Sequence, residues 1–324
     1  MKTFPKSLIK TSLKRFFPSL IYCNWVLQLA LTAPTVASAA DIGQTFATPE
    51  EAVAALAAAT SAQDTNALRV LFGSTAADLQ NPDHVQATND LIEFTTAFNQ
   101  AHRIVHKSDS KCVLYIGENS WPFPIPIVKK DGQWFFDAEA GKDELLTRRI
   151  GDNELSTLEA VRAYVEAQRE YASKDRDGDE VLEYAQKITS TPGTKDGLYW
   201  PPDVDGEISP LGPRVAQAQA QGYWRSPREA GAKPEPFHGY FFKILTHQGK
   251  SAPLGKYDYI INGKMIAGFA LVAWPAEYGN TGIMTFIVNQ QGRVYQKDLG
   301  PKTAKTAAAM KSYDPDKTWT ISPD

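Results

Sequence analysis

The spacing of apolar residues switches repeatedly along this 324-residue chain, and this switching constrains the fold more than any other feature. Residues 49–101 show helical spacing, residues 103–136 form short strand-like runs, residues 144–173 return to helical spacing, and residues 238–297 alternate as strands again. Helical blocks followed by blocks of short strands are typical of α+β folds with antiparallel sheets. We therefore predict an α+β fold in which helices followed by a sheet occur twice.

Three helices and an antiparallel sheet are expected in the first block. Thr48 can accept a hydrogen bond from a free helix amide and Pro49 suits the first helical position, so a helix should run from here to about residue 59. Asp64 should cap a second helix, and a third should span residues 84–101. The expected strands cover residues 103–106, 112–116, 124–128 and 134–136, with a hairpin turn at Lys130-Asp131-Gly132.

This block resembles the nuclear-transport-factor-2-like (NTF2-like) superfamily, in which helices pack on a bent antiparallel sheet. The run from Phe123 to Asp137 looks like the final hairpin of such domains. The resemblance implies a cone-shaped domain over residues 46–140, whose sheet commonly encloses a cavity.

The second block, residues 141–324, is predicted to pack a long helix on an antiparallel meander sheet. A first helix is expected over residues 144–150, and Asp152 or Asn153 should cap a longer one over residues 154–173. The expected strands cover residues 238–245, 257–261, 267–273, 282–288 and 293–297, with turns at residues 262–263 and 290–292 and a terminal helix at residues 301–310.

The first 39 residues have the composition of a cleaved secretory signal peptide. They carry five basic and no acidic residues, then an apolar run from Phe16 to about Pro34, and then Ala37-Ser38-Ala39. Small residues at positions −3 and −1 are what cleavage of a signal peptide requires. We predict cleavage after Ala39, a short leader over residues 40–45, and a periplasmic or secreted mature protein.

Three alternatives to general secretion followed by cleavage can be weighed. An uncleaved anchor needs about 20 consecutive apolar residues, and Pro18 and Asn24 interrupt the run. Tyr22 before Cys23 disfavours processing as a lipoprotein. Lys14-Arg15-Phe16-Phe17 lacks one arginine of a twin-arginine signal, so general secretion is favoured and the export route stays open.

Removal of the signal leaves 285 residues, which suggests about two domains. These residues carry 29 basic against 37 acidic side chains, a net charge of −8. Nucleic acids and anionic membranes attract clustered Lys and Arg, so neither is an expected partner.

Only Cys112 remains, so no intrachain disulfide can form and a buried thiol is expected. No later segment reaches the length of a transmembrane helix.

Seven short runs across the chain form a recognisable signature. They are Arg148-Arg149-Ile150-Gly151, Ala167-Gln168-Arg169-Glu170-Tyr171-Ala172, Asp196-Gly197-Leu198-Tyr199-Trp200-Pro201, Ser209-Pro210-Leu211-Gly212-Pro213, His238-Gly239-Tyr240-Phe241-Phe242, the run from Gly268 to Pro275, and Thr285-Phe286-Ile287-Val288-Asn289. With these runs the chain resembles the exported bacterial family catalogued as domain of unknown function 2950 (DUF2950). The resemblance covers essentially all of the mature length, and it implies no particular activity.

The second block also resembles the globular head of type IV pilins and pseudopilins. The shared features are a helix ending near Tyr171, an acidic loop, and a closing hairpin from Gly282 to Tyr295. Pilins start with a cleaved prepilin leader and a long apolar helix, whereas this chain has a conventional signal and an extra domain. The resemblance therefore implies a head-like fold.

The loop Asp175-Arg176-Asp177-Gly178-Asp179-Glu180 contains the candidate metal ligands Asp175, Asp177 and Asp179. Alternating carboxylates and a turn glycine suit Ca²⁺, which prefers oxygen ligands. An EF-hand register started at Asp175 nevertheless places Glu180 where glycine belongs and Gln186 where a bidentate glutamate belongs. The alternative is a solvated loop, and no cofactor other than Ca²⁺ is expected.

Five further residues are candidates for ligand or interface contacts. Arg148 and Arg149 precede the expected break between helices, where they could recognise an anion or hold the two domains together through nearby carboxylates. Tyr199, Trp200 and Trp274 could form a stacking platform for a sugar or a peptide, although aromatic side chains more often lie in the core.

The sequence lacks the common catalytic motifs. It contains no Gly-x-Ser-x-Gly elbow, His-Glu-x-x-His helix, phosphate-binding loop or paired-cysteine site. Ser108-Asp109-Ser110-Lys111 matches Ser-x-x-Lys without its partner motifs, and the five histidines form no metal-ligand pair on a predicted element. We therefore assign no catalytic residue.

Export, the missing catalytic motifs and the resemblances favour a non-enzymatic interaction or scaffolding module of the cell envelope, with an envelope protein or a small ligand as partner. Two alternatives stay open. The first is a periplasmic protein that binds a lipid or a glycan, and the second is an envelope hydrolase with an unrecognised site.

Overall fold

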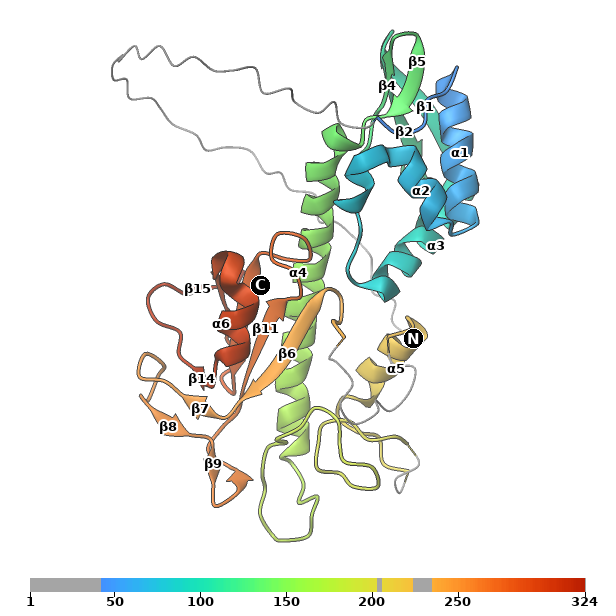
Figure 1. Ribbon diagram of the computed structural model, residues 1–324. Coiled ribbons are helices and arrows are strands. Elements are labelled where there is room, and N and C mark those ends of the chain that lie inside the picture. Colours follow the sequence, from blue (N-terminus) through green and yellow to red (C-terminus); the bar gives the residue numbers. More distant parts are fainter. Residues whose placement is uncertain (1–41, 203–205, 224–234, 324) are drawn as a thin grey trace, which may run out of the picture. The chain divides into compact units, whose positions relative to one another are not determined.

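The computed structural model describes residues 42–202, 206–223 and 235–323 (Figure 1). The predicted signal peptide, its cleavage site after Ala39 and Cys23 lie outside the described residues. Within the described ranges, no helix combines the length and apolar character needed to cross a membrane.

The first block begins with the helices expected from its capping residues. They are α1 (Pro49–Ser61), α2 (Thr65–Phe72), the 3₁₀ helix η1 (Gly73–Ala77) and α3 (His84–Gln100). Thr48 Oγ1 accepts a hydrogen bond from the Glu51 amide at 3.2 Å, while Asp64 Oδ1 accepts from two amides of the first turn of α2 at 3.0 Å. These caps satisfy amides that have no partner inside their helices.

An antiparallel sheet follows, made of β1 (His102–Ser108), β2 (Lys111–Ile116), β3 (Trp121–Pro122), β4 (Ile127–Lys130) and β5 (Gln133–Phe136). The strand order is β1-β2-β4-β5, and β3 pairs with β2. The turn between β4 and β5 places Asp131 and Gly132 at φ values of 51° and 83°, as its sequence predicts. Strand pairing begins at Ile127 instead of the expected Pro124, because Pro124 and Pro126 have no N–H to donate.

Aromatic side chains fill the core between these helices and the sheet. Phe123 packs against Phe94 and Phe136 with ring centroids 5.5 and 6.2 Å apart, and Phe136 packs against Phe72 at 5.7 Å. Cys112 is fully buried in the same cluster, with its Sγ 3.2 Å from Nδ1 of His106. The expectation of a buried thiol is confirmed.

The helical segment between the blocks is one continuous helix, α4 (Ala138–Tyr171), so the predicted break at Asp152 or Asn153 is wrong. Asn153 is fully buried, and its side chain does not cap a helix. Its Nδ2 donates to Thr281 O at 2.9 Å and its Oδ1 accepts from Gln86 at 2.7 Å. These distant partners satisfy the amide, so the helix passes through a residue that often starts one.

The second block contains an antiparallel sheet of β6 (Tyr240–Leu245), β11 (Ala270–Pro275), β12 (Met284–Asn289), β13 (Tyr295–Asp298) and β15 (Thr320–Ile321). Its order is β15-β13-β12-β11-β6. The smaller strands are the hairpin β9 (Ile260–Ile261) and β10 (Lys264–Met265), and the group β7 (His247–Gln248), β8 (Tyr257–Asp258) and β14 (Ser312–Tyr313). The remaining helices are α5 (Gly212–Ala220), η2 (Gly300–Lys302) and α6 (Thr303–Ala309).

The long helix lies against this sheet, which shows the predicted α+β arrangement (Figure 1). Val161, Tyr164 and Val165 of α4 are buried in a cluster with the apolar residues of β11 and β12, and Tyr164 donates to Ala270 O at 3.3 Å. A second cluster, from Phe46 to Ala138, forms the core of the first block. The division into domains at residue 140 stays a prediction.

Candidate functional site

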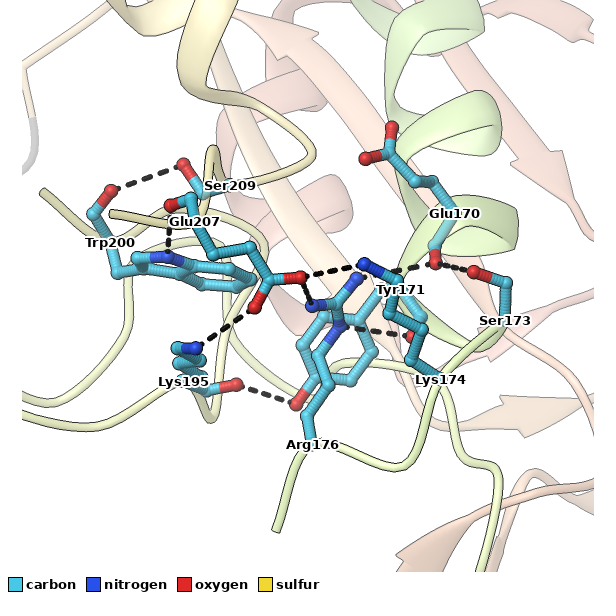
Figure 2. Close-up of polar contacts among 9 residues, drawn as sticks. All are labelled: Glu170, Tyr171, Ser173, Lys174, Arg176, Lys195, Trp200, Glu207 and Ser209. Carbon is cyan, nitrogen blue, oxygen red and sulfur yellow. Dashed lines mark hydrogen bonds and ion pairs between the residues drawn. The ribbon is translucent and has the colours of Figure 1, made fainter. Parts of the chain in front are cut away.

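After α4 ends at Tyr171, the chain folds back on the end of this helix around Arg176 (Figure 2). The Arg176 guanidinium lies 5.1 Å from the ring centroids of both Tyr171 and Trp200. Its side chain is only 4% exposed. A cation between two aromatic faces is stabilised by both rings, so Arg176 holds the loop against the end of the helix.

The Glu207 carboxylate forms ion pairs with Arg176 and with two lysines beside it (Figure 2). Its carboxylate accepts from Lys174 at 3.0 Å, and from Arg176 and Lys195 at 2.9 Å each. These hydrogen bonds lower the pKa of Glu207 to about 2. The Glu207 carbonyl also accepts from the Trp200 indole at 3.0 Å. Because every one of these groups is paired within the protein, the cluster is a structural anchor.

A cleft of about 540 Å³ lies beside this anchor and shares Tyr171, Arg176 and Lys195 with it. Its other lining residues are Asp177, Glu183, Tyr184, Gln186, Lys187, Gly193, Thr194 and Asp196. Clefts of this size are typical of sites for small molecules. We take the cleft as the candidate functional site.

The acidic groups of the cleft are neutralised by neighbouring cations. Asp196 accepts from Lys187 at 2.6 Å, while Glu183 accepts from Lys264 at 3.0 Å and Asp177 also pairs with Lys264. Desolvation opposes ionisation of Asp196, but the hydrogen bonds from Lys187 and from Thr191 hold the pKa of Asp196 well below its usual value. Asp196 is therefore an ionised acceptor at neutral pH.

Two lining residues keep unused hydrogen-bonding capacity among the described residues. Tyr184 is half-buried, with its ring against Phe269 at a centroid distance of 4.8 Å, and its hydroxyl makes no hydrogen bond there. Gln186 donates its amide to Gly263 O at 2.7 Å, which leaves the amide oxygen able to accept. The cleft thus offers one hydroxyl and one amide oxygen to a ligand.

The three aspartates predicted as metal ligands do come together. One carboxylate oxygen from each of Asp175, Asp177 and Asp179 lies within 4.8 Å of the others. Asp175 accepts hydrogen bonds from three backbone amides of its own loop. The Lys264 ammonium contacts Asp177, and it lies 2.6 Å from Asp179. A lysine of β10 therefore already supplies a positive charge here, and the calcium ion predicted from the sequence would have to displace it.

Arg149 contacts two separate segments of the chain, away from the lining of the cleft. Its guanidinium donates to the backbone oxygens of Leu79 at 2.6 Å and Gln80 at 3.0 Å, and to the Asn280 side chain at 2.5 Å. Desolvation lowers the pKa of Arg149. The partners are carbonyl and amide oxygens, so this residue links α4 to two loops through neutral acceptors.

Arg148 lies on the surface of α4. It forms an ion pair with Glu144 at 2.7 Å, donates to Pro122 O at 3.0 Å, and lies 4.7 Å from the ring centroid of Trp121. These contacts hold α4 against β3 and use the guanidinium within the protein.

The predicted aromatic residues do not line the cleft. Trp200 and Trp274 are 1% and 9% exposed and belong to the core of the second block. Tyr199 is half-buried, and its backbone amide bonds to Ile188 O at 2.9 Å. The structure thus separates the candidates from the sequence into a core pair of tryptophans, a half-buried tyrosine, two arginines of α4 and an acidic turn.

Sequence reasoning missed Glu207, Lys195, Tyr184 and Lys264. Their partners lie far along the chain; Lys264 and Asp177, for example, are 87 residues apart. No local spacing predicts such pairs. Asp196 had a weak local signal, because its carboxylate accepts from the Thr191 amide at 2.7 Å, only five residues earlier, and holds the turn at residues 191–194.

Comparison with known proteins places the chain in a family. No curated protein and no solved structure matches it. The family model described as "Protein of unknown function (DUF2950)" matches residues 43–321, which is most of the chain. The resemblance seen in the seven sequence runs is confirmed, and the chain belongs to the DUF2950 family.

Proposed function

We propose that this chain is an exported, non-enzymatic protein of the cell envelope that binds a partner or ligand in the cleft beside Arg176. The observation that carries the proposal is the cleft itself, which combines a volume of about 540 Å³ with charged groups already paired inside the protein. Such a surface is preorganised to form hydrogen bonds, and binding then requires little rearrangement.

The electrostatics of the cleft favour binding over acid–base catalysis. A general acid or base works best when its pKa lies near the working pH. Desolvation opposes ionisation of Asp196, but hydrogen bonds from Lys187 and Thr191 hold its pKa below the usual value. The hydrogen bonds that Lys264 donates to Asp177, Asp179 and Glu183 hold the pKa of Lys264 above its usual value. Groups shifted in these directions do not exchange protons readily near neutral pH. This supports the interaction module over the hydrolase.

The packing of the first block weighs against a lipid held under its sheet. Phe72, Phe94, Phe123 and Phe136 form a chain of ring contacts in the region where a cone-shaped sheet would enclose an apolar ligand. The cleft in the second block is lined instead by charged and hydroxyl groups. If the ligand is small, a glycan therefore fits the chain better than a lipid.

A matched pair of variants tests the role of the cleft. Gln186→Trp should block the cleft, whereas Gln219→Trp places the same side chain on an exposed position of α5. The measurement is capture of components from an envelope extract on immobilised protein. We expect specific components to bind the unmodified chain and Gln219→Trp, and to be lost with Gln186→Trp. Equal capture by all three proteins, or no capture by any, would contradict the proposal.

A further inference from the structure

We propose that the cleft binds an uncharged carbohydrate, specifically a short neutral oligosaccharide. This inference rests on the proposed function, since it names the class of ligand for the same cleft. It is carried by the balance of charge around the cleft, by the unused hydrogen-bonding groups and by a fixed tyrosine ring.

The charges that line the cleft cancel. The cations are Arg176, Lys187 and Lys195, and the anions are Asp177, Glu183 and Asp196. Each anion is bonded to a lysine within the protein. Beside each lining group of opposite charge, a charged ligand would also meet a group of its own charge. To form an ion pair with the cleft, the ligand would have to break an ion pair inside the protein. A neutral ligand avoids both costs.

The polar groups of the cleft also exclude a purely apolar ligand. Lys187 and Asp196 keep 51% and 41% of their side chains exposed, so they are hydrated in the free protein. Covering them with hydrocarbon would remove that water without replacing its hydrogen bonds, which is costly. Sugar hydroxyls both donate and accept, so they can replace water on an ammonium group and on a carboxylate alike.

Two side chains are placed to select such a ligand. Tyr184 has its ring held by an edge-to-face contact with Phe269 at an interplanar angle of 65°, so its position is defined before binding. A tyrosine presents an apolar face and a polar hydroxyl, which suits a sugar ring that has C–H faces and O–H edges. The free amide oxygen of Gln186 adds an acceptor on the same segment.

Isothermal titration calorimetry with the chain beginning at Ala40 tests the ligand class. The probes are neutral gluco-, manno-, galacto- and N-acetylglucosamine oligosaccharides, with a deacetylated cationic and a uronic-acid anionic oligosaccharide as charged counterparts. We expect at least one neutral oligosaccharide to bind about tenfold or more tightly than either charged one. Its affinity should not change between about 50 mM and 500 mM NaCl, because no net charge is screened.

Variants locate the binding to the cleft. Gln186→Ala should weaken the neutral oligosaccharide about fivefold, as expected for one lost hydrogen bond. Gln219→Ala removes the same side chain from exposed α5 and should leave affinity unchanged. Tyr184→Ala should weaken binding about tenfold or more. Tyr184→Phe keeps the ring that packs on Phe269, so it tests the hydroxyl without disturbing the core.

The outcomes separate this inference from the proposal beneath it. If no neutral oligosaccharide binds, or if a charged one binds best, the carbohydrate inference is overturned. The proposed function still stands in that case if Gln186→Trp abolishes capture of an envelope component. If Gln186→Ala and Gln219→Ala affect sugar binding equally, the sugar does not bind in the cleft, and the inference is also overturned.

Discussion

Arg176 shows how one side chain can organise a long segment whose described residues form almost no regular structure. It donates to Glu207 and to two carbonyls at the end of α4, and it lies between the rings of Tyr171 and Trp200. A buried guanidinium requires this number of partners, because an unpaired buried charge is costly. The carboxylate of Glu207 therefore has a structural role that depends on its ionisation.

Glu207→Gln should lower the free energy of unfolding at pH 7 by about 1–2 kcal/mol, since three charge-assisted hydrogen bonds lose their ionised acceptor. The pKa of Glu207 is lowered from 4.5 to about 2, so its stabilisation is present above about pH 4.5 and is lost as the pH falls towards 2. The difference between the unmodified chain and the variant should shrink over that range in urea titrations.

Glu166→Gln provides the control for this experiment, because Glu166 is exposed on α4. It should change stability by less than about 0.5 kcal/mol at every pH. A Glu207→Gln variant as stable as this control at pH 7 would rule out a structural role for the carboxylate.

Among the elements, α4 and the turn before β6 depend closely on each other. Gly239 has a φ of 72°, and a Cβ at this position would lie 2.6 Å from Asn153 Nδ2 and 2.9 Å from Thr281 Cβ. Its amide donates to the buried carboxylate of Asp83 at 3.0 Å. Because Gly239 has no Cβ, the turn before β6 can pack closely against the middle of α4, where the Asn153 side chain forms part of the contact.

Gly239→Ala should destabilise the protein by about 2–4 kcal/mol, because it adds both an unfavourable φ and a steric clash. Gly263→Ala is the matched control, since Gly263 has a φ of 83° and no atom within 4 Å of an added Cβ. That variant should cost only about 1–2 kcal/mol from the backbone conformation. Equal losses in thermal unfolding would show that the close approach to α4 is unimportant.

The acidic turn at Asp175, Asp177 and Asp179 yields a prediction about calcium. Because Lys264 already pairs with Asp177 and Asp179, CaCl₂ at about 5 mM should leave the melting temperature unchanged relative to MgCl₂. A rise specific to Ca²⁺ that disappears in Asp179→Asn would instead identify the turn as a calcium site and show that the ion displaces the lysine.

At the scale of the whole molecule, the chain combines two hydrophobic clusters with one long helix. The cluster of the first block ends at Ala138, at the start of α4, and that of the second block begins at Leu158. Stability therefore comes from apolar burial in both blocks, and the described residues contain a single cysteine, Cys112. The described part of the chain therefore contains no disulfide.

The predicted export can be checked on the full-length chain in a bacterial host. Mass spectrometry of the envelope fraction should find a mature protein that begins at Ala40. Ala39→Lys replaces the small residue at the −1 position and should block processing. A substitution to Gly at the same position should permit it. Unprocessed protein that stays in the cytosol would contradict the predicted localisation.

Prediction from sequence succeeded where the physical cause is local. The helices that start at Pro49 and Thr65 were predicted from their caps, and the turns at residues 131–132 and 262–263 from residues that tolerate positive φ. It was wrong at Asn153, whose side chain bonds to Thr281 and Gln86 instead of capping a helix. The position of the cleft could not be predicted, because its walls come from segments that meet only in the folded chain.

The sequence by itself determined the α+β class, the alternation of helical and strand blocks, the family and the buried state of Cys112. These depend on apolar periodicity and on hydrogen bonds between residues a few positions apart. Only the tertiary structure decided that α4 is continuous, that Arg176 and Glu207 anchor the loop, and that Lys264 joins the acidic turn. Arg176 and Glu207 are 31 residues apart in the sequence, and Asp177 and Lys264 are 87 apart. Such pairs form only when the packed backbone brings the two segments together, so no local sequence pattern predicts them.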